Sequence, residues 1–252
     1  MVSRFKRIAN VRQASGRLFT VCTDDHAPAA IRARVRVEDW ILLDPSVGDA
    51  VVIDAGRVKI ASRSCALIND PEVCVEACRE PIHEAWVLVL DQLLKTFASQ
   101  KAAGSFEDLF HARIVALTAR LPAADAVCRL LGLGQGMTPA GDDILVGYMA
   151  VEHIRGIADL PGAVCTIVGS EAWSRTSDFS ASVLEAASFG HVAGDLLRLI
   201  ESLTQKPSPV TTEAVETYMW NTGHSSGRDT VFGIACGIGN LHACSKKGRQ
   251  TA

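Results

Sequence analysis

The segment Gly132-Leu-Gly-Gln-Gly-Met-Thr-Pro-Ala-Gly-Asp-Asp143 contains the densest set of residues that could bind a ligand. Its alternate glycines allow positive φ angles and let a ligand approach bare backbone. Thr138 is placed to cap a following helix, and Pro139 to occupy the first helical position. A helix N-terminus at the end of such a loop offers free N–H groups and partial positive charge, which suit a phosphate or a carboxylate.

This segment matches neither of the common nucleotide-binding loops. No Gly-Lys-Ser/Thr follows it, as a Walker A loop requires, and Met137 stands where a dinucleotide fingerprint has its third glycine. The structural alternative is a tight connection between packed helices, with Asp142 and Asp143 complementing the helix dipole. Two adjacent carboxylates after three glycines favour a ligand-binding role.

A second segment, Gly223-His-Ser-Ser-Gly-Arg-Asp229, repeats part of this pattern. The pattern G-x-D-x3-G occurs at Gly141–Gly147 and again at Gly227–Gly233, an offset of 86 residues (227 − 141). Glycine costs up to about 1 kcal/mol inside a helix, so matched glycines need a reason. We expect Gly147 and Gly233 to let two helices approach closely. Their two starts would then share one anion pocket.

A third segment, Arg175-Thr-Ser-Asp178, places hydroxyls and a carboxylate at another helix start, either as a cap or as part of the same pocket. The sequence has no lysine between Lys101 and Lys206. An anion in this part of the chain would therefore depend on backbone N–H groups, hydroxyls and arginines, whose planar fork suits carboxylate or phosphate.

The candidate catalytic residues are His224, Asp143 and Asp229, which would orient a transferring group or exchange a proton with it. For His224 the alternative is a loop histidine that bonds a helix cap. The candidate binding residues lie in the same three segments: Gly134, Gly136, Thr138, Gly141, Asp142, Arg175, Thr176, Ser177, Ser225, Ser226, Gly227 and Arg228.

Metal chemistry has weaker support in the sequence. Asp142, Asp143, Asp229 and His224 form an oxygen-rich set that could hold Mg²⁺ together with a phosphate. Neither an H-E-x-x-H nor an EF-hand pattern occurs. We therefore assign no metal ligands and expect no required cofactor, with magnesium as a compatible addition.

The composition of the chain changes near residue 80, which predicts an α+β protein with a small β-rich domain over 1–80, barrel-like or sandwich-like, and a larger all-helical domain over 81–252. Short runs rich in β-branched residues predict strands at Leu18–Thr23, Ala30–Val37, Trp40–Leu43, Ala50–Ile53 and Val58–Ala61. Apolar residues at helical spacing predict helices at 81–100, 105–120, 123–131, 139–155, 180–189, 194–203, 212–220 and 226–241.

Three arginines alternate along one of the predicted strands. Arg32, Arg34 and Arg36 are two residues apart, so their side chains lie on one face of the strand. We interpret this face as solvated, because charge stripes are usually just exposed to water. An anion-binding strip is the alternative.

Overall composition excludes several classes of protein. The 252 residues are 48% hydrophobic, with a net charge of −3, which argues against a disordered chain and against a general nucleic-acid binder. No apolar run approaches the roughly 20 residues of a membrane span. The eight cysteines include no C-x-x-C pair, and the first twenty residues have no signal-peptide pattern, so we expect a reduced cytoplasmic protein.

The motifs resemble those of the AllH-like family, long described only as a domain of unknown function. The family hallmark, G-L-G-P-G-L-T-P-S-G-D-D, is similar to Gly132–Asp143, with Gln135 for proline and Met137 for leucine. A later G-H-S/T-S-G-x-D is similar to Gly223–Asp229, and Arg175-Thr-Ser-Asp-Phe-Ser180 is similar to a short T-x-x-S stretch. The order of a β-rich part and helices also fits.

The resemblance implies a subunit of oxamate carbamoyltransferase in allantoin (purine) breakdown, or a related transferase. That system moves a carbamoyl group between oxalurate and phosphate, giving oxamate and carbamoyl phosphate, and needs several different subunits. It implies as ligand a small anion such as phosphate, carbamoyl phosphate or a carboxylate, bound at the two helix starts. The alternative is a non-catalytic subunit that binds a metabolite or stabilises a complex. Neither reading fixes the oligomeric state, and an oligomer is compatible with both.

Overall fold

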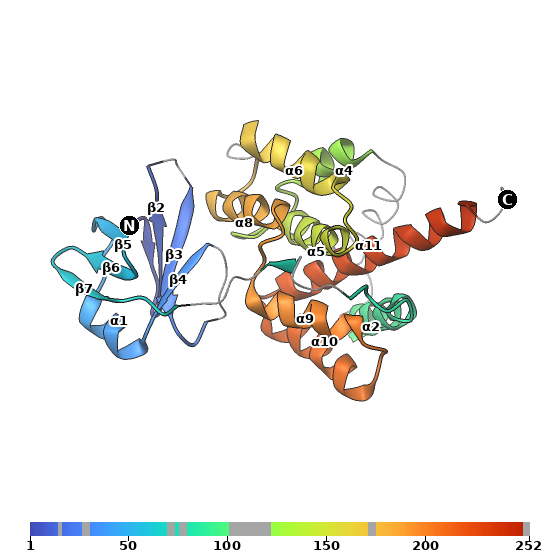
Figure 1. Cartoon of the computed structure of the whole chain (residues 1–252), viewed down its shortest axis with the longest axis horizontal. Helices are drawn as coiled ribbons and strands as arrows, with labels where there is room; N and C mark the ends of the chain where they lie inside the picture. Colours follow the sequence, from blue (N-terminus) through green and yellow to red (C-terminus); the bar gives the residue numbers. More distant parts are fainter. Residues whose placement is uncertain are drawn as a thin grey trace.

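The computed structural model describes residues 1–14, 17–26, 31–69, 74–75, 80–100, 122–170 and 175–248. Strands between Ser3 and Ala66 form a β-sheet region, and helices from Trp86 onward form a larger helical region beside it (Figure 1). The α+β fold expected from the sequence is confirmed. The helix expected at 105–120 lies outside the described residues. Within them, no helix is both long and apolar enough to cross a membrane.

The first sheet contains four strands in the order β1-β2-β3-β4. These are β1 (Ser3–Arg4), β2 (Ile8–Arg12), β3 (Leu18–Thr23) and β4 (Arg32–Val35). The first three pair antiparallel, whereas β3 and β4 are parallel, with Thr20 opposite Arg32. The predicted strand at Leu18–Thr23 is confirmed, and the one expected from Ala30 to Val37 is shorter, at Arg32–Val35.

The second sheet is an antiparallel meander of β5 (Val51–Asp54), β6 (Arg57–Ile60) and β7 (Arg63–Ala66). A shared apolar core joins it to the first sheet, with Val21 and Val35 on one side and Val58 and Ile60 on the other. The two sheets thus enclose a single small core, which suits the short length of their strands.

The strand predicted at Trp40–Leu43 is wrong. These residues lie in helix α1 (Val37–Leu43), where Trp40 and Leu43 are buried and Ile41 and Leu42 are exposed. Residues three apart share a face of a helix, so this burial pattern has helical rather than strand spacing. The Trp40 side chain also donates a hydrogen bond from Nε1 to the Lys6 carbonyl (3.0 Å), which ties α1 to the first sheet.

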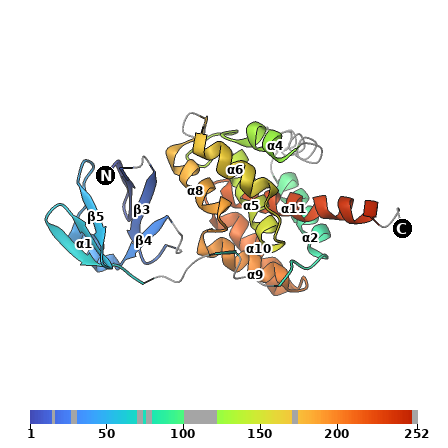
Figure 2. The same cartoon turned by 45° about the horizontal axis from the view of Figure 1, so that its top comes forward.

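The helical region packs around α5, which crosses α11 at its centre (Figures 1 and 2). Almost all of α5 is buried, as expected for a helix that is covered on every side. The helices in chain order are α2 (Trp86–Gln100), α4 (Ala123–Leu130), α5 (Ala140–Ile154), α6 (Asp159–Ser170), α8 (Asp178–Ser188), α9 (Gly194–Thr204), α10 (Pro209–Asn221) and α11 (Ser226–Gly248).

Helix α6 was not predicted from the sequence. It contains Pro161 and two glycines, Gly162 and Gly169, all poor helix formers. Pro161 falls in the first turn, where the backbone N–H groups have no partner within the helix, so the proline is tolerated there. Packing of Leu160, Val164 and Val168 into the core then outweighs the weak local preference.

The glycines of the repeated motif bring α5 and α11 into backbone contact. A Cβ atom at Gly147 would lie 2.0 Å from the Thr230 carbonyl oxygen, and one at Gly233 would lie 2.1 Å from the Ile144 carbonyl oxygen. The 86-residue offset between the motifs relates the two contacts. Gly233 is the equivalent of Gly147 (147 + 86 = 233), and Ile144 is the equivalent of Thr230 (230 − 86 = 144). The contact is therefore two-fold in character, and the close approach predicted from the glycines is confirmed.

The two regions meet where β3 packs on α8. Arg12 pairs with Asp178 and Arg17 with Glu185, and the buried N–H of Leu18 donates to the Ser182 hydroxyl (3.0 Å). The ion pairs are partly exposed and worth little individually. The buried hydrogen bond is the more demanding contact, because an unsatisfied backbone N–H there would cost free energy.

Candidate functional site

The starts of α5 and α11 lie next to each other. The Thr138 and Ser226 hydroxyl oxygens are 3.0 Å apart and share a hydrogen bond. The expectation that Thr138 caps α5 is wrong: Pro139 occupies the N-cap position, and no side chain caps this helix. The Thr138 hydroxyl instead bonds Ser226, the first residue of α11.

Backbone N–H groups at these helix starts already have acceptors. Gly141 donates to Leu133, and Asp142 and Asp143 both donate to Pro139. On α11, Gly227 donates to Thr222 and Asp229 donates to Ser225. In this structure these five N–H groups are therefore used within the protein. Anion binding at the two starts stays a prediction.

Asp142 holds the glycine-rich segment in place. Its carboxylate accepts hydrogen bonds from the Gly132 N–H (2.7 Å), the Ser180 hydroxyl (2.6 Å) and the Thr176 hydroxyl. Gly132 must be glycine here, because a Cβ atom would lie 1.8 Å from the Arg175 carbonyl oxygen. Burial raises the pKa of Asp142, and these hydrogen bonds oppose the rise. This carboxylate is therefore engaged within the protein.

Asp143, the neighbouring carboxyl group, is bonded differently. Its side chain is 8% exposed and hydrogen-bonds with Ser226 and Thr138, but its Oδ2 atom is buried without a hydrogen-bond partner among the described residues. Burial, with the nearby negative charges of Asp229 and Asp142, raises the pKa of Asp143 to about 7. Near neutral pH this group can therefore hold or release a proton.

Asp143 lines a cavity of about 220 Å³ between the start of α11, α8 and α9. One wall is apolar and includes Phe179, Val183 and Leu196. The polar lining includes six residues of several elements: Thr138, His191, Asp195, Tyr218, Ser226 and Thr230. Arg32, from strand β4, completes the lining from the β-sheet region.

Four of these six residues were missed from the sequence, and one of them is Thr230, which directly follows Asp229 in α11. Asp195 follows the start of α9, His191 lies just before that helix, and Tyr218 lies in α10. Desolvation and the charges of Asp195 and Asp143 raise the pKa of Tyr218 well above its ordinary value, so its hydroxyl stays protonated. Only Asp195, in the first turn of a helix, had a local signal, and that signal reads equally well as dipole complementation.

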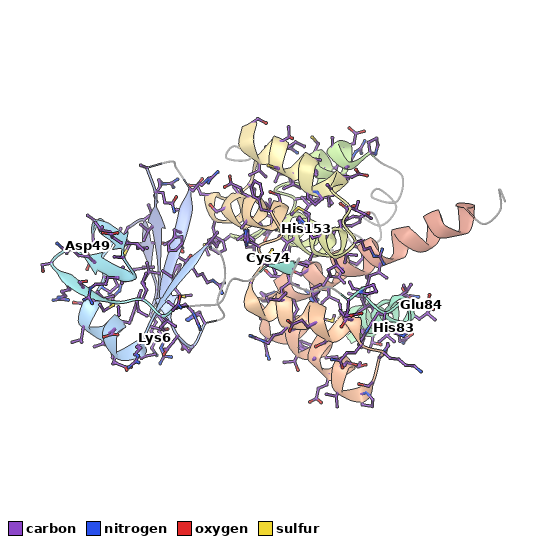
Figure 3. All side chains as sticks on the ribbon, viewed as in Figure 1. Lys6, Asp49, Cys74, His83, Glu84 and His153 are labelled. Atoms are coloured by element: carbon purple, nitrogen blue, oxygen red, sulfur yellow. The ribbon has the colours of Figure 1, made fainter. Side chains whose placement is uncertain are left out.

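His191 is held in the cavity wall by a short stretch of chain from the N-terminal part. Cys74 and His191 form an isolated antiparallel bridge, and Val75 N–H donates to the Gly190 carbonyl (2.8 Å). Figure 3 shows Cys74 beside the helical region, and His153 further along α5. The His153 ring bonds the Ala187 carbonyl (3.0 Å), so it serves packing between α5 and α8.

The structure brings some predicted site residues to the cavity and not others. Thr138, Asp143 and Ser226 line the cavity. Asp229 is buried nearby, and its negative charge contributes to the raised pKa of Asp143. His224 is exposed and is not among the lining residues. Nor do the remaining candidates line it: Gly134, Gly136, Gly141, Asp142, Arg175, Thr176, Ser177, Ser225, Gly227 and Arg228.

The third segment supports the glycine-rich segment rather than the cavity. Ser177 caps α8 by accepting from the Ser180 N–H and donates its own hydroxyl hydrogen to the Met137 carbonyl. Arg175 donates to the Cys128 carbonyl, and Thr176 to Asp142. The helix start predicted at this segment is thus a cap that also fixes the neighbouring loop.

A resident metal has no obvious site in this part of the protein. Asp142 is fully bonded within the protein, and His224 faces solvent. Among the residues whose side chains are described, no cluster of three or more His, Cys, Asp or Glu could hold an ion. Magnesium carried in with a phosphate stays a prediction.

Comparison with known proteins supports the family resemblance. Residues 130–238 match the family model described as oxamate carbamoyltransferase subunit AllH. This part of the chain, residues 130–238, is AllH-like. The matched stretch runs from the last residues of α4 into α11 and contains both glycine motifs and most of the cavity lining. Searches of curated proteins and of solved structures found no match.

Proposed function

We propose that the chain is the AllH-type subunit that binds the carbamoyl-bearing substrate of an oxamate carbamoyltransferase, in the cavity beside Asp143. One observation carries the proposal: the buried Oδ2 atom of Asp143, which lacks a hydrogen-bond partner among the described residues. A buried acceptor left unsatisfied costs about 1–3 kcal/mol. An amide N–H of the ligand would satisfy it, and oxamate and oxalurate both carry such groups.

The cavity suits a ligand of this size and shape. At about 220 Å³ it is smaller than the roughly 300–1,000 Å³ typical of pockets for drug-sized molecules. The apolar wall that includes Phe179 and Val183 can cover the face of a flat molecule. The hydroxyls of Thr138 and Ser226 bond each other and Asp143, and their oxygen atoms can also accept hydrogen bonds from N–H groups of the ligand.

Asp143 is the group placed to assist transfer. In the reaction, a phosphate oxygen forms a bond to the carbamoyl carbon of oxalurate while the bond from that carbon to nitrogen breaks. The nitrogen takes up a proton and leaves as the amide of oxamate. A carboxyl group with a pKa of about 7 can supply that proton near neutral pH. Asp229 would contribute by raising the pKa of Asp143.

Isothermal titration of the purified chain with oxamate and oxalurate tests the proposal. We expect both to bind, and Asp143→Ala to weaken binding by tenfold or more, with Asp143→Asn as a second variant of unchanged size. Asp125→Asn, which removes an exposed carboxylate on α4, is the matched control and should bind as the natural chain does. Absence of binding by either compound, or equal binding by the Asp143 variants, would overturn the proposal.

A second experiment separates catalysis from simple binding. If the reacting groups belong to another subunit, this chain would bind the metabolite without contributing a proton. Reconstitution with the other carbamoyltransferase subunits should then give full activity with Asp143→Asn at saturating substrate. Loss of kcat in that variant favours the catalytic role of Asp143.

A further inference from the structure

We infer that Arg32, in the β-sheet region, recognises a carboxylate at the far end of the ligand held by Asp143. The inference rests on the proposed function and adds to it a residue that determines specificity for the carboxylate. The cavity would accept a small molecule that carries an amide or carbamoyl group at one end and a carboxylate at the other. The β-sheet region would then be part of the binding site.

Arg32 differs from its two neighbours in the alternating row. Arg34 donates two hydrogen bonds to backbone carbonyls of Asp24 (3.0 Å) and His26 (2.8 Å), so it stabilises a turn. Arg36 is exposed at the N-cap position of α1, where its side chain makes no capping bond. Arg32 alone of the three lines the cavity. At Arg32 this position favours the alternative interpretation of the row, an anion-binding role.

Strand pairing fixes Arg32 relative to the cavity. Arg32 lies opposite Thr20 in the parallel pair of β3 and β4, and Thr20 N–H donates to the Ile31 carbonyl (2.9 Å). Strand β3 is in turn bonded to α8 through Leu18 and Ser182. Because α8 also supplies Phe179 and Val183 to the cavity wall, Arg32 is anchored to the helix that forms the wall it faces.

The charges of the residues that line the cavity favour one orientation of the bound ligand. Asp143 and Asp195 are acidic lining residues, whereas Arg32 is the one lysine or arginine side chain that lines the cavity within the described part of the chain. A dianion would place negative charge beside at least one of the two carboxyl groups, which disfavours it. A carboxylate at the Arg32 end and N–H donors at the Asp143 end match the charge of the lining group at each end, since guanidinium groups bind carboxylates well.

Three related compounds distinguish this arrangement by isothermal titration. Oxamate has an amide and a carboxylate, methyl oxamate has the amide without the charge, and oxalate has two carboxylates. For the natural chain we expect oxamate to bind at least tenfold more tightly than either of the others. Arg32→Met should bring the affinity for oxamate down to that for methyl oxamate, while the affinity for methyl oxamate changes less than twofold.

Two further variants make the result interpretable. Arg36→Met, which removes an exposed arginine two residues away, should leave all three affinities unchanged. Arg32→Lys retains the charge without the fork and should give an intermediate affinity for oxamate, with a melting temperature near that of the natural chain. If Arg32→Met reduces the affinities for oxamate and methyl oxamate equally, Arg32 acts on the fold or on the cavity shape, and the inference is wrong.

Failure of this inference can be told apart from failure of the proposed function. If the natural chain binds oxamate and Asp143→Ala loses it but Arg32→Met does not, only the role of Arg32 is overturned. If the natural chain binds neither oxamate nor oxalurate, the proposed function itself fails and the inference fails with it.

Discussion

Gly147 on α5 and the carbonyl group of Thr230 on α11 are in direct backbone contact, and a Cβ atom at Gly147 would lie 2.0 Å from that oxygen. No Cβ atom tolerates such a distance, so an alanine would push the two central helices apart. The same helices carry Asp143 and Asp229. Their separation therefore sets both the packing of the core and the electrostatics of the cavity.

Substitution of either contact glycine should destabilise the protein. We expect Gly147→Ala and Gly233→Ala each to lower the free energy of unfolding by about 1–3 kcal/mol or more, as overpacking does. Gly162→Ala is the matched control, because Gly162 lies in α6 with open space at its Cβ position. Helix propensity predicts that this control raises stability by up to about 1 kcal/mol. Denaturant unfolding measures all three, and an unchanged Gly147→Ala would contradict the close contact.

Asp143 should make stability depend on pH in a defined direction. Its pKa rises from an ordinary value of 3.8 to about 7 in the folded protein, so the native state holds this proton more tightly than the unfolded chain does. Its contribution is therefore fully present below about pH 4 and is lost as pH rises through about 7. Asp143→Asn has no such proton. The melting temperature of this variant relative to the natural chain should rise between pH 5 and pH 8.

Glu152 provides the comparison for this pH effect. Burial raises its pKa to about 7 as well, and its carboxylate accepts a hydrogen bond from Leu160 N–H (2.9 Å), away from the Asp143 cavity. Glu152→Gln should show the same relative gain in melting temperature with rising pH but leave oxamate affinity unchanged. A flat difference for both variants across this pH range would show that neither carboxyl group is neutral in the folded protein.

Asp142 is expected to matter for stability rather than for ligand contact. Asp142→Ala removes the acceptor of three donors, from Gly132, Thr176 and Ser180. The buried Ser180 hydroxyl, left unsatisfied, costs on the order of 1–3 kcal/mol, and the half-buried Gly132 and Thr176 donors cost less because water can reach them. A double-mutant cycle with Thr176→Val measures the coupling. In the Asp142→Ala background the Thr176→Val change should have less effect than in the natural chain, and equal effects would argue against the bond.

The junction between β3 and α8 offers a test of buried against exposed contacts. Ser182→Ala leaves the buried Leu18 N–H without its acceptor and should cost about 1–3 kcal/mol. Arg17→Ala breaks a partly exposed ion pair with Glu185 and should cost less than about 1 kcal/mol. Guanidinium unfolding of both variants gives the comparison. A larger loss for Arg17→Ala would mean that the ion pair, rather than the hydrogen bond, secures the sheet to the helix.

The contact between α5 and α11 could be predicted because it depends on a local pattern. Matched glycines at a fixed offset have few explanations inside helices, and backbone contact is the simplest of them. The prediction of a strand at Trp40–Leu43 failed because this segment has no such local pattern. Four consecutive large apolar residues have no visible period, and only burial of Trp40 and Leu43 with exposure of Ile41 and Leu42 shows the helical spacing.

The cavity itself could be predicted only in part. Thr138, Asp143 and Ser226 stand out because they adjoin the glycine motifs. Tyr218 and His191 reach the cavity through tertiary packing, which no local sequence pattern indicates, and the position of Asp195 in the first turn of α9 is explained equally well by the helix dipole. The expected anion site was also based on free N–H groups, and the structure shows several of those N–H groups bonded to backbone carbonyls within their own turns.

The bonds that join the first sheet and its β2–β3 connection to α8 span 164 to 168 residues of sequence. Contacts at such separations form late, because the entropy of closing a long loop must be met before they stabilise anything. Arg32 and Ser226, which line the same cavity, are 194 residues apart in the sequence (226 − 32). Binding competence should therefore appear as one of the last steps of folding, after both the sheets and the helices have formed.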